Sequence, residues 1–318
     1  MTEATPSSAP EAERELVLER VIDAPRALVF QAWINPEHLL NWFGPRGFSC
    51  KTQAIDVREG GMWQFVMHGP DGTSYPNVHR YVEIVENERI VYDAGETLDG
   101  PAQFRTTVTL IDEGVRTRLR MASVFPNAEA VAFVKGFGAV ELGYQTLDKL
   151  AERVDTMVFS LSRTVEAPRE LVYKAWTEAE RLAKWWGPKG FAIEVLSFEL
   201  RPGGIFHYRL ANEAGHEMYG KFVYLDVQAP ERLAYISSFS DPDGNTVRAP
   251  FSQDFPLEVY NLITFSEDNG TTTLSLSGGP LKATEAERAF YHGMKASMQQ
   301  GFSGTFDQLD AYLAGTQA

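Results

Sequence analysis

Residues 18–48 read LERVIDAPRALVFQAWINPEHLLNWFGPRGF, and residues 161–191 read LSRTVEAPRELVYKAWTEAERLAKWWGPKGF. The two stretches align without a gap at a spacing of 143 residues, and 24 of 76 positions are identical between residues 17–92 and 160–235. A period of this length far exceeds the roughly 20 to 50 residues of a solenoid repeat. The chain therefore contains two complete copies of one domain.

The repeat sets the expected domain boundaries. We predict a first domain over residues 15–154 and a second over residues 157–318, and we expect the Ser-, Pro-, Ala- and Glu-rich residues 1–14 to form a disordered tail. The second copy carries an insertion over residues 241–256 that is dense in Pro, Asp, Gly and Asn, a composition typical of loops. The sequence leaves two roles open for this insertion, a lid over a cavity or a contact in a dimer.

Both copies predict the same order of elements. In the first copy the alternating residues 16–22 predict a half-buried strand. Apolar residues at helical spacing then predict two short helices, which begin at Pro25 and Pro36. Six strands and a closing helix of about 25 residues follow in the predicted order. This order indicates an α+β fold in which a curved antiparallel sheet wraps round the long helix and leaves an apolar gap for a small ligand.

Several motifs of both copies resemble the helix-grip superfamily, which is also called START-like, SRPBCC or Bet v 1-like. The motifs are Ala24-Pro25-Arg26 with Ala167-Pro168-Arg169, Trp42-Phe43-Gly44-Pro45 with Trp185-Trp186-Gly187-Pro188, Gly60-Gly61 with Gly203-Gly204, the stretch 68–72 of the first copy, and the stretch from 283 to 305 of the second. Within the superfamily the chain is similar to the bacterial branch named after the activator of heat-shock-protein-90 ATPase. The resemblance implies two tandem helix-grip domains with cavities for apolar or aromatic small molecules, and it leaves their chemistry open.

Composition and charge exclude several classes of function. Lys and Arg total 29 against 43 Asp and Glu, and the net charge of −14 disfavours nucleic acid and anionic membrane surfaces as partners. No stretch approaches the roughly 18 consecutive apolar residues of a membrane span. The single cysteine, Cys50, argues against a secreted disulfide-bonded protein, and we interpret it as a small buried apolar side chain. We expect a cytoplasmic protein.

The sequence carries no pattern for a metal or a cofactor. The six histidines show no HxH, HxxxH or HExxH spacing. The two glycine pairs precede predicted strands, whereas a phosphate-binding loop opens a helix. We therefore expect neither a metal nor a cofactor.

Candidate site residues of the first copy lie on two adjacent predicted strands. The candidates for lining a cavity are Trp63, Phe65, Met67, Asn77, His79 and Tyr81. For acid–base catalysis the candidates are His68, His79 and Tyr81, because a histidine with a pKa of about 6.5 exchanges protons near neutral pH. For His68 we favour a role in a hairpin turn. For Asn77 and His79 the parity of the strand is open, so they either line the cavity or face outward.

The second copy offers a different set of candidates. They are Phe206, Tyr208, His216, Tyr219 and Tyr224 on the predicted strands, with Met294 and Met298 on the closing helix. Across the repeat His79 is replaced by Phe222, so an acid–base site built on His79 would be absent from the second copy. We interpret the paired tryptophans as core packing rather than as an aromatic box for a flat ligand.

Three functional hypotheses follow from these observations. The first is the binding, sequestration or carriage of a hydrophobic or aromatic small molecule, by a chain that is a candidate homodimer. The second is an enzyme of the cyclase, hydrolase or lyase type that uses acid–base residues of the first copy. The third, a co-chaperone-like partner protein, rests on the family name alone and ranks last.

Overall fold

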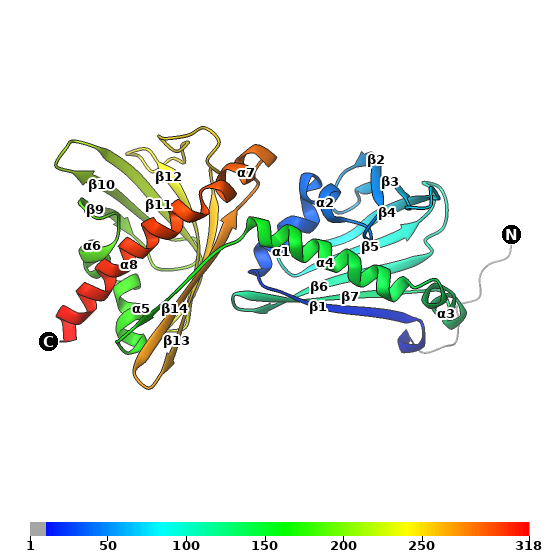
Figure 1. Cartoon of the computed structure of the whole chain (residues 1–318), viewed down its shortest axis with the longest axis horizontal. Coiled ribbons are helices and arrows are strands. Elements are labelled where there is room, and N and C mark those ends of the chain that lie inside the picture. The colour runs from blue at the N-terminus through cyan, green and yellow to red at the C-terminus, as the bar shows by residue number, and fades with distance from the viewer. Residues whose placement is uncertain (1–10, 318) are drawn as a thin grey trace. The chain divides into compact units, whose positions relative to one another are not determined.

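The computed structural model of the chain describes residues 11–317. It has two compact units, with the boundary between Thr156 and Met157 (Figure 1). Most of the predicted disordered tail, residues 1–10, lies outside the described residues. The next three residues form a short 3₁₀ helix, η1 (Glu11–Glu13), and the backbone oxygen of Arg14 then accepts a hydrogen bond from Phe125 N at 2.9 Å.

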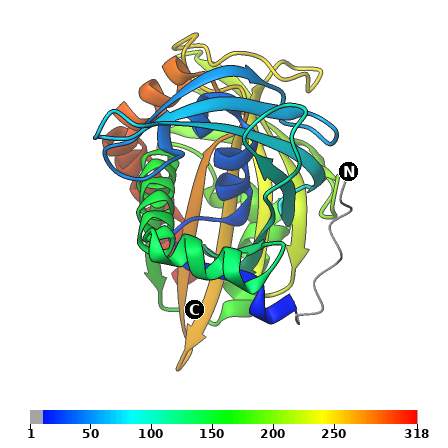
Figure 2. The same cartoon turned by 90° about the vertical axis from the view of Figure 1, so that its right-hand side faces the viewer.

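The first unit is a seven-stranded antiparallel sheet in the order β1-β7-β6-β5-β4-β3-β2, with four α-helices. Its strands are β1 (Glu15–Ile22), β2 (Ser49–Ile55), β3 (Met62–His68), β4 (Ser74–Val85), β5 (Arg89–Gly95), β6 (Phe104–Glu113) and β7 (Arg116–Val124). Its helices are α1 (Arg26–Ile34), α2 (Pro36–Trp42), α3 (Ala128–Gly136) and α4 (Ala139–Met157). In Figure 2 the strands of this unit curve over its helices.

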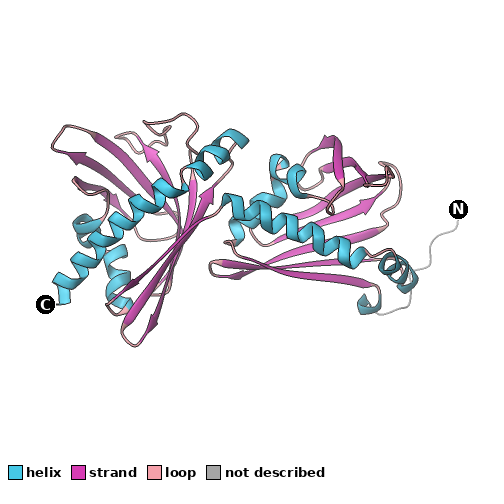
Figure 3. Ribbon diagram, viewed as in Figure 1, coloured by secondary structure: helices cyan, strands magenta, loops and turns pink. Residues whose placement is uncertain are grey.

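The second unit repeats this topology as β8-β14-β13-β12-β11-β10-β9. Its strands are β8 (Phe159–Val165), β9 (Phe191–Phe198), β10 (Ile205–Asn212), β11 (Glu217–Gln228), β12 (Arg232–Ser240), β13 (Val259–Asp268) and β14 (Thr271–Pro280). Its helices are α5 (Arg169–Thr177), α6 (Ala179–Trp185), α7 (Glu285–Gly293) and α8 (Lys295–Gln317). The predicted α+β fold, two tandem helix-grip domains, is confirmed (Figure 3).

The tryptophan pairs hold the two short helices of each unit together. The ring centroids of Trp33 and Trp42 lie 4.8 Å apart, and those of Trp176 and Trp185 lie at the same distance. The indole of Trp42 donates to Ala32 O at 2.9 Å, and all four rings are almost fully buried. The interpretation of these pairs as core packing is therefore confirmed.

Irregular pairing bends the sheet of the second unit around its helices. The register shifts between His207 and Tyr208 on β10 and between Tyr224 and Asp226 on β11. Such bulges add one residue to a strand and increase its local twist and bend. The concave face that results is the one on which the cavity described below opens.

The predicted long closing helix is present in each unit as α4 and α8, and a short helix precedes it. In the first unit α3 ends at Gly136, and Gly138 has φ of +77°, a conformation that glycine adopts without steric cost. In the second unit α7 ends at Gly293, and α8 begins after Met294. The short helices α3 and α7 were not predicted as separate elements, because helical periodicity on either side of a one- to two-residue break looks continuous in sequence.

Candidate functional site

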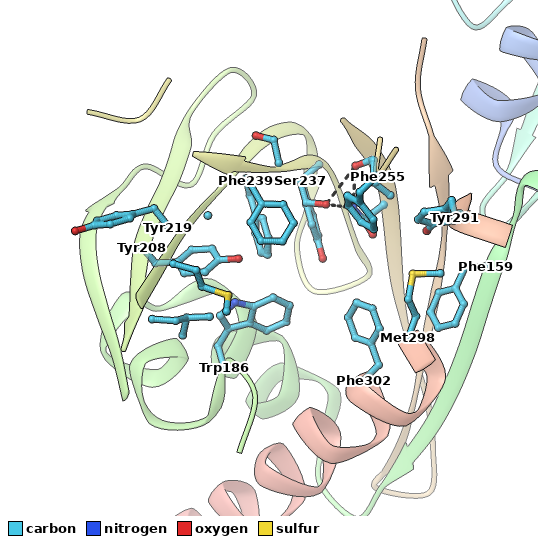
Figure 4. Close-up of a pocket in the computed structure, with 18 residues that line it drawn as sticks. Phe159, Trp186, Tyr208, Tyr219, Ser237, Phe239, Phe255, Tyr291, Met298 and Phe302 are labelled. Carbon is cyan, nitrogen blue, oxygen red and sulfur yellow. Dashed lines mark hydrogen bonds between the residues drawn. The ribbon is translucent and has the colours of Figure 1, made fainter. Parts of the chain in front are cut away.

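A cavity of about 190 Å³ lies in the second unit, between the sheet and the helices α7 and α8 (Figure 4). Its lining residues are Phe159, Trp186, Tyr208, Leu210, Met218, Tyr219, Gly220, Phe222, Tyr235, Ser237, Ser238, Phe239, Phe255, Val259, Asn261, Tyr291, Met298 and Phe302. Among these 18 described residues none carries a charged side chain. The cavity is therefore suited to an uncharged, largely apolar molecule.

One wall of the cavity is built from aromatic rings of the sheet. Phe222 of β11 stacks on Tyr235 of β12 with ring centroids 4.1 Å apart, and the edge of Trp186 meets Phe222 at 5.3 Å. Strand alternation places these rings, because Phe222 and Tyr235 occupy inward positions of adjacent strands. Trp186 reaches them from the turn that follows α6. The wall offers flat aromatic faces to a bound ring.

The opposite side of the cavity comes from the helices. Met298 and Phe302 lie one turn apart on α8, and Phe302 stacks against Phe159 of β8 at 5.6 Å. Tyr291 extends from α7, which begins with a capping box between Thr284 and Glu287. This side is mainly apolar, with a flexible thioether at Met298 that adapts to irregular shapes.

Polar groups in the cavity are uncharged, and they are buried or half-buried. Burial raises the pKa of the Tyr208 hydroxyl to about 12, and it also raises the pKa values of Tyr235 and Tyr291. The Nδ2 atom of Asn261 donates to Ser237 Oγ and to the backbone oxygen of Val259, both at 2.9 Å. These groups act as hydrogen-bonding neutral groups at physiological pH.

The insertion of residues 241–256 closes one side of this cavity. Its Phe255 lines the cavity and contacts the rings of Phe239 at 5.9 Å and Tyr291 at 6.1 Å. Arg248 in the middle of the insertion forms an ion pair with Glu287 of α7, and it donates to the backbone oxygen of Phe255 at 3.2 Å. The insertion is thus fastened to a helix of its own unit beside the cavity.

The cavity brings together three of the residues that were predicted from the second copy, namely Tyr208, Tyr219 and Met298. Phe206 and Tyr224 lie outside the lining, in the core beneath it, with about 0% and 1% of their surfaces exposed. His216 lies in the hairpin between β10 and β11 and pairs with Asn212.

Met294 lies in the break between α7 and α8, where its backbone N–H caps α7, and it is not among the lining residues. Residues that sequence reasoning did not single out complete the lining, among them Ser237, Asn261 and Tyr291. Their signal was present, because Ser237 and Asn261 interrupt otherwise apolar inward positions of β12 and β13. Whether these two side chains face the cavity depends on which alternate residues of β12 and β13 point inward, and the sequence alone does not specify this.

The corresponding region of the first unit is a packed aromatic cluster. His79 stacks on Tyr92 with ring centroids 4.3 Å apart and meets the edges of Phe43, Trp63 and Phe65 at 5.1 to 5.6 Å. Burial lowers the pKa of His79 to about 3, so the ring is neutral at physiological pH. Tyr81 is buried in the same core, and burial raises its pKa.

The remaining candidates of the first unit lie at its hairpin. His68 Nδ1 is 2.9 Å from Ser74 Oγ, next to the turn at residues 69–72, as the turn interpretation predicts. Asn77 donates to Tyr75 O at 2.8 Å, and the Met67 sulfur packs near Gly44. The structure therefore does not gather His68, His79 and Tyr81 into one acid–base group.

Two further features concern metal binding and membrane insertion in residues 11–317. Over this range no cluster of three or more His, Cys, Asp or Glu side chains is placed to hold a metal ion. None of the helices there has the length and apolar character that crossing a bilayer requires.

Comparison with known proteins identifies a family match in each half. The model of the family described as activator of Hsp90 ATPase homolog 1-like protein matches residues 23–155 and 166–314. No curated protein matches the chain. The two family segments fall within the two structural units, and the second includes all the described cavity-lining residues except Phe159 of β8.

Several solved structures resemble the chain. Protein Ms6760 from Mycobacterium smegmatis is 25% identical, with 51% of this chain and 94% of that chain covered and a TM-score of 0.42. Protein CV1439 from Chromobacterium violaceum is 26% identical, with 49% and 96% covered and a TM-score of 0.37. BexL, described as a di-domain ARO/CYC from the BE-7585A biosynthetic pathway, is 15% identical, with 94% and 98% covered and a TM-score of 0.36.

Proposed function

Because the chain belongs to the activator of Hsp90 ATPase homolog 1-like family in both of its halves, we propose that its second unit binds a small, uncharged aromatic molecule. Helix-grip proteins commonly bind hydrophobic ligands. The observation that carries the proposal is the cavity of about 190 Å³ with its aromatic, uncharged lining. Sequestration or carriage of the bound molecule is the role that this binding supports.

The size of the cavity limits the ligand. An apolar cavity of about 150 Å³ is large enough to bind benzene. The slightly larger space under Phe255 and Phe302 suits a molecule with one ring and a short substituent. Long acyl chains and large multi-ring compounds would require the insertion or α8 to move.

The lining also disfavours charged ligands. Moving an ion out of water costs many kcal/mol unless a partner of opposite charge compensates. The cavity offers hydroxyl and amide groups, which satisfy a neutral polar substituent. A neutral ligand is therefore favoured over a carboxylate or an amine of the same size.

Of the two roles open for the insertion, we propose that it acts as a lid. Phe255 forms part of the cavity wall, and the Arg248–Glu287 ion pair ties the insertion to α7 of the same unit. A ligand that enters on this side must pass Phe255. The insertion would therefore control the rates of binding and release more than the final affinity.

The catalytic alternative has less support than binding. Four aromatic rings enclose His79, and its lowered pKa leaves it unprotonated at neutral pH. His68 lies at the β3–β4 hairpin, where it contacts Ser74, and not beside His79. A general acid–base role needs a group with a pKa near the working pH and within reach of substrate. The co-chaperone hypothesis rests on the family name alone and has no support from the residues of the cavity.

Thermal unfolding of the full chain with α-methylstyrene, benzoate and benzylammonium tests the proposal. We expect a saturable rise in Tm with α-methylstyrene and none with the two charged analogues. The Met298→Trp variant should fill the cavity and remove this rise. Met294→Trp is the matched control, because Met294 lies outside the lining, and it should retain the rise. Failure of both α-methylstyrene and the equally neutral acetophenone to stabilise the wild type would reject the proposal.

A further inference from the structure

Ser237 and Asn261 form a polar pair in the otherwise apolar cavity wall. They lie on adjacent strands, where Asn261 is opposite Tyr235 and Ser237 is opposite Val259. Asn261 is buried, with 7% of its surface exposed, and both residues line the cavity. The dashed lines in Figure 4 mark hydrogen bonds between the residues drawn, among them the bond from Asn261 to Ser237 and the bond from Asn261 to the backbone oxygen of Val259.

The hydrogen bonds fix the orientation of the Asn261 amide. The backbone oxygen of Val259 can only accept, so the Asn261 atom that lies 2.9 Å from it is the nitrogen. The second hydrogen of the same nitrogen points to Ser237 Oγ, also at 2.9 Å. Both Nδ2 hydrogens of Asn261 are therefore used within the protein.

This arrangement makes Ser237 a hydrogen-bond donor. Its oxygen accepts from Asn261, so its own hydrogen must go elsewhere. The acceptor that the structure offers is Val259 O at 3.5 Å, beyond the usual 2.5–3.0 Å of an O–H···O bond, and this oxygen already accepts from Asn261. The hydroxyl hydrogen of Ser237 is thus available to an acceptor in the cavity.

The first unit provides an internal comparison. Ala94 stands at the position of Ser237, and Thr106 stands at the position of Asn261. Thr106 bonds to Ser123 at 2.8 Å, so its hydroxyl is satisfied within the wall. In the second unit Gly278 replaces Ser123 and offers no hydroxyl. The side-chain oxygen Oδ1 of Asn261 lies close to this glycine, 3.1 Å from the position that a Cβ atom would occupy. The exposed donor is therefore specific to the second copy.

We infer that Ser237 determines specificity in this cavity by donating a hydrogen bond to the carbonyl oxygen of a neutral aromatic ketone or aldehyde. This inference rests on the proposed function and names its ligand class. A carbonyl oxygen satisfies the donor without adding a hydrogen that needs its own acceptor, which a phenol would add. The aromatic wall of Trp186 and Phe222 takes the ring of the same ligand.

Titration of the full chain with acetophenone and α-methylstyrene tests the inference, because the two probes have nearly the same shape and differ in a carbonyl oxygen against a methylene group. We expect the wild type to bind acetophenone about three- to tenfold more tightly, the usual effect of one hydrogen bond. Ser237→Ala should remove this preference by weakening acetophenone binding and leave the affinity for α-methylstyrene unchanged.

The variant is expected to fold, because alanine occupies the equivalent position 94 of the first unit. Ser275→Ala on β14, whose hydroxyl bonds to Ser162 away from the cavity, is the control and should bind both probes like the wild type. Equal wild-type affinities for the probes, or a Ser237→Ala variant that keeps the preference, would overturn the role of Ser237 and leave the proposed function intact. Absence of binding by both probes would overturn the proposed function itself.

Discussion

The hydroxyl of Tyr208 lies over Gly220, its partner on the neighbouring strand: a Cβ atom on Gly220 would come 2.5 Å from Tyr208 Oη and 2.6 Å from Cζ. Contacts this short do not occur, so the position of the Tyr208 ring depends on the glycine. In the first unit the same cross-strand pair is Phe65 and Asn77, and the Phe65 ring stacks on Trp63 at 3.9 Å, whereas Tyr208 stacks on the equivalent Phe206 at 4.9 Å. The ring therefore lies closer to its stacking partner in the copy where a side chain replaces the glycine.

We predict that Gly220→Asn lowers the free energy of unfolding by about 2 kcal/mol, because the new side chain overpacks against Tyr208. It should also weaken binding of α-methylstyrene, since Tyr208 lines the cavity. Chemical denaturation and ligand titration measure the two effects. The double variant Tyr208→Phe/Gly220→Asn recreates the pair of the first unit and should recover part of the lost stability. If the effects of the two single substitutions on the free energy of unfolding simply add in the double variant, the proposed steric clash between Tyr208 and the side chain introduced at position 220 is contradicted.

The ion pair between Arg248 and Glu287 fastens the insertion over the cavity. Although burial raises the pKa of Glu287, hydrogen bonds from Arg248 and Thr284 lower it below its usual value, so the carboxylate is charged at neutral pH. Glu287→Gln keeps the side chain that caps α7 and removes the charge. We predict a severalfold faster release of α-methylstyrene, measured by stopped-flow tryptophan fluorescence.

A suitable control for this prediction is Glu199→Gln. Glu199 forms an ion pair with Arg201 that is well exposed, and both residues lie outside the cavity lining. This change should leave the release rate unchanged. If Glu287→Gln releases ligand at the wild-type rate, the insertion is not the barrier to exit.

The buried His79 makes the stability of the first unit depend on pH. Its pKa is about 3 in the folded chain and about 6.5 when unfolded, so between these values the unfolded chain binds a proton that the folded chain excludes. Stability should be complete above about pH 6.5 and should fall by about 1.4 kcal/mol for each pH unit below it. At pH 5 the accumulated loss is about 2 kcal/mol.

We predict that His79→Phe removes this contribution. Phenylalanine fits the position, because Phe222 makes the same stack on Tyr235 in the second unit. Denaturation at pH 7 and pH 5 should show that the variant loses less stability on acidification than the wild type. The reciprocal change Phe222→His should steepen the pH dependence. Parallel pH profiles of wild type and His79→Phe would show that His79 binds its proton equally well in the folded and unfolded states, and would contradict the lowered pKa.

Cys50 is the one thiol of the chain, and burial raises its pKa to about 11. The thiolate is the reactive form, so at pH 8 only about one molecule in a thousand carries Cys50 in its reactive form. We predict that iodoacetamide modifies the folded protein at least about a hundredfold more slowly than the denatured chain, as followed by mass spectrometry. Comparable rates in the two states would contradict the protection of this half-buried thiol.

Much of the fold could be predicted because repeated short-range patterns specify it. Alternating strands, Pro25 at the start of a helix and the tryptophan pairs recur in both copies, and each produced the expected element. The long closing helix was predicted correctly, but the short helix before it was missed because the break between them spans only Phe137 and Gly138 in the first unit and Met294 in the second. A break so short leaves the helical pattern on both sides in place.

The candidate site was less predictable than the fold. Tyr208, Tyr219 and Met298 came from residue type and approximate position, and they lie on the cavity. Ser237 and Asn261 are 24 residues apart, and their contact depends on the register between β12 and β13. A shift of one residue would turn each side chain to the other face of the sheet, so composition alone could not place them.

By itself, the sequence determined that this protein contains two copies of one α+β domain, because hydrophobic periodicity, turn residues and helix caps act over short distances and are repeated along the chain. Only the tertiary structure decided that the second copy holds the described cavity while His79 of the first is packed among aromatic rings. That outcome depends on strand register and on contacts such as Tyr208 with Gly220, where residues distant in sequence compete for the same space.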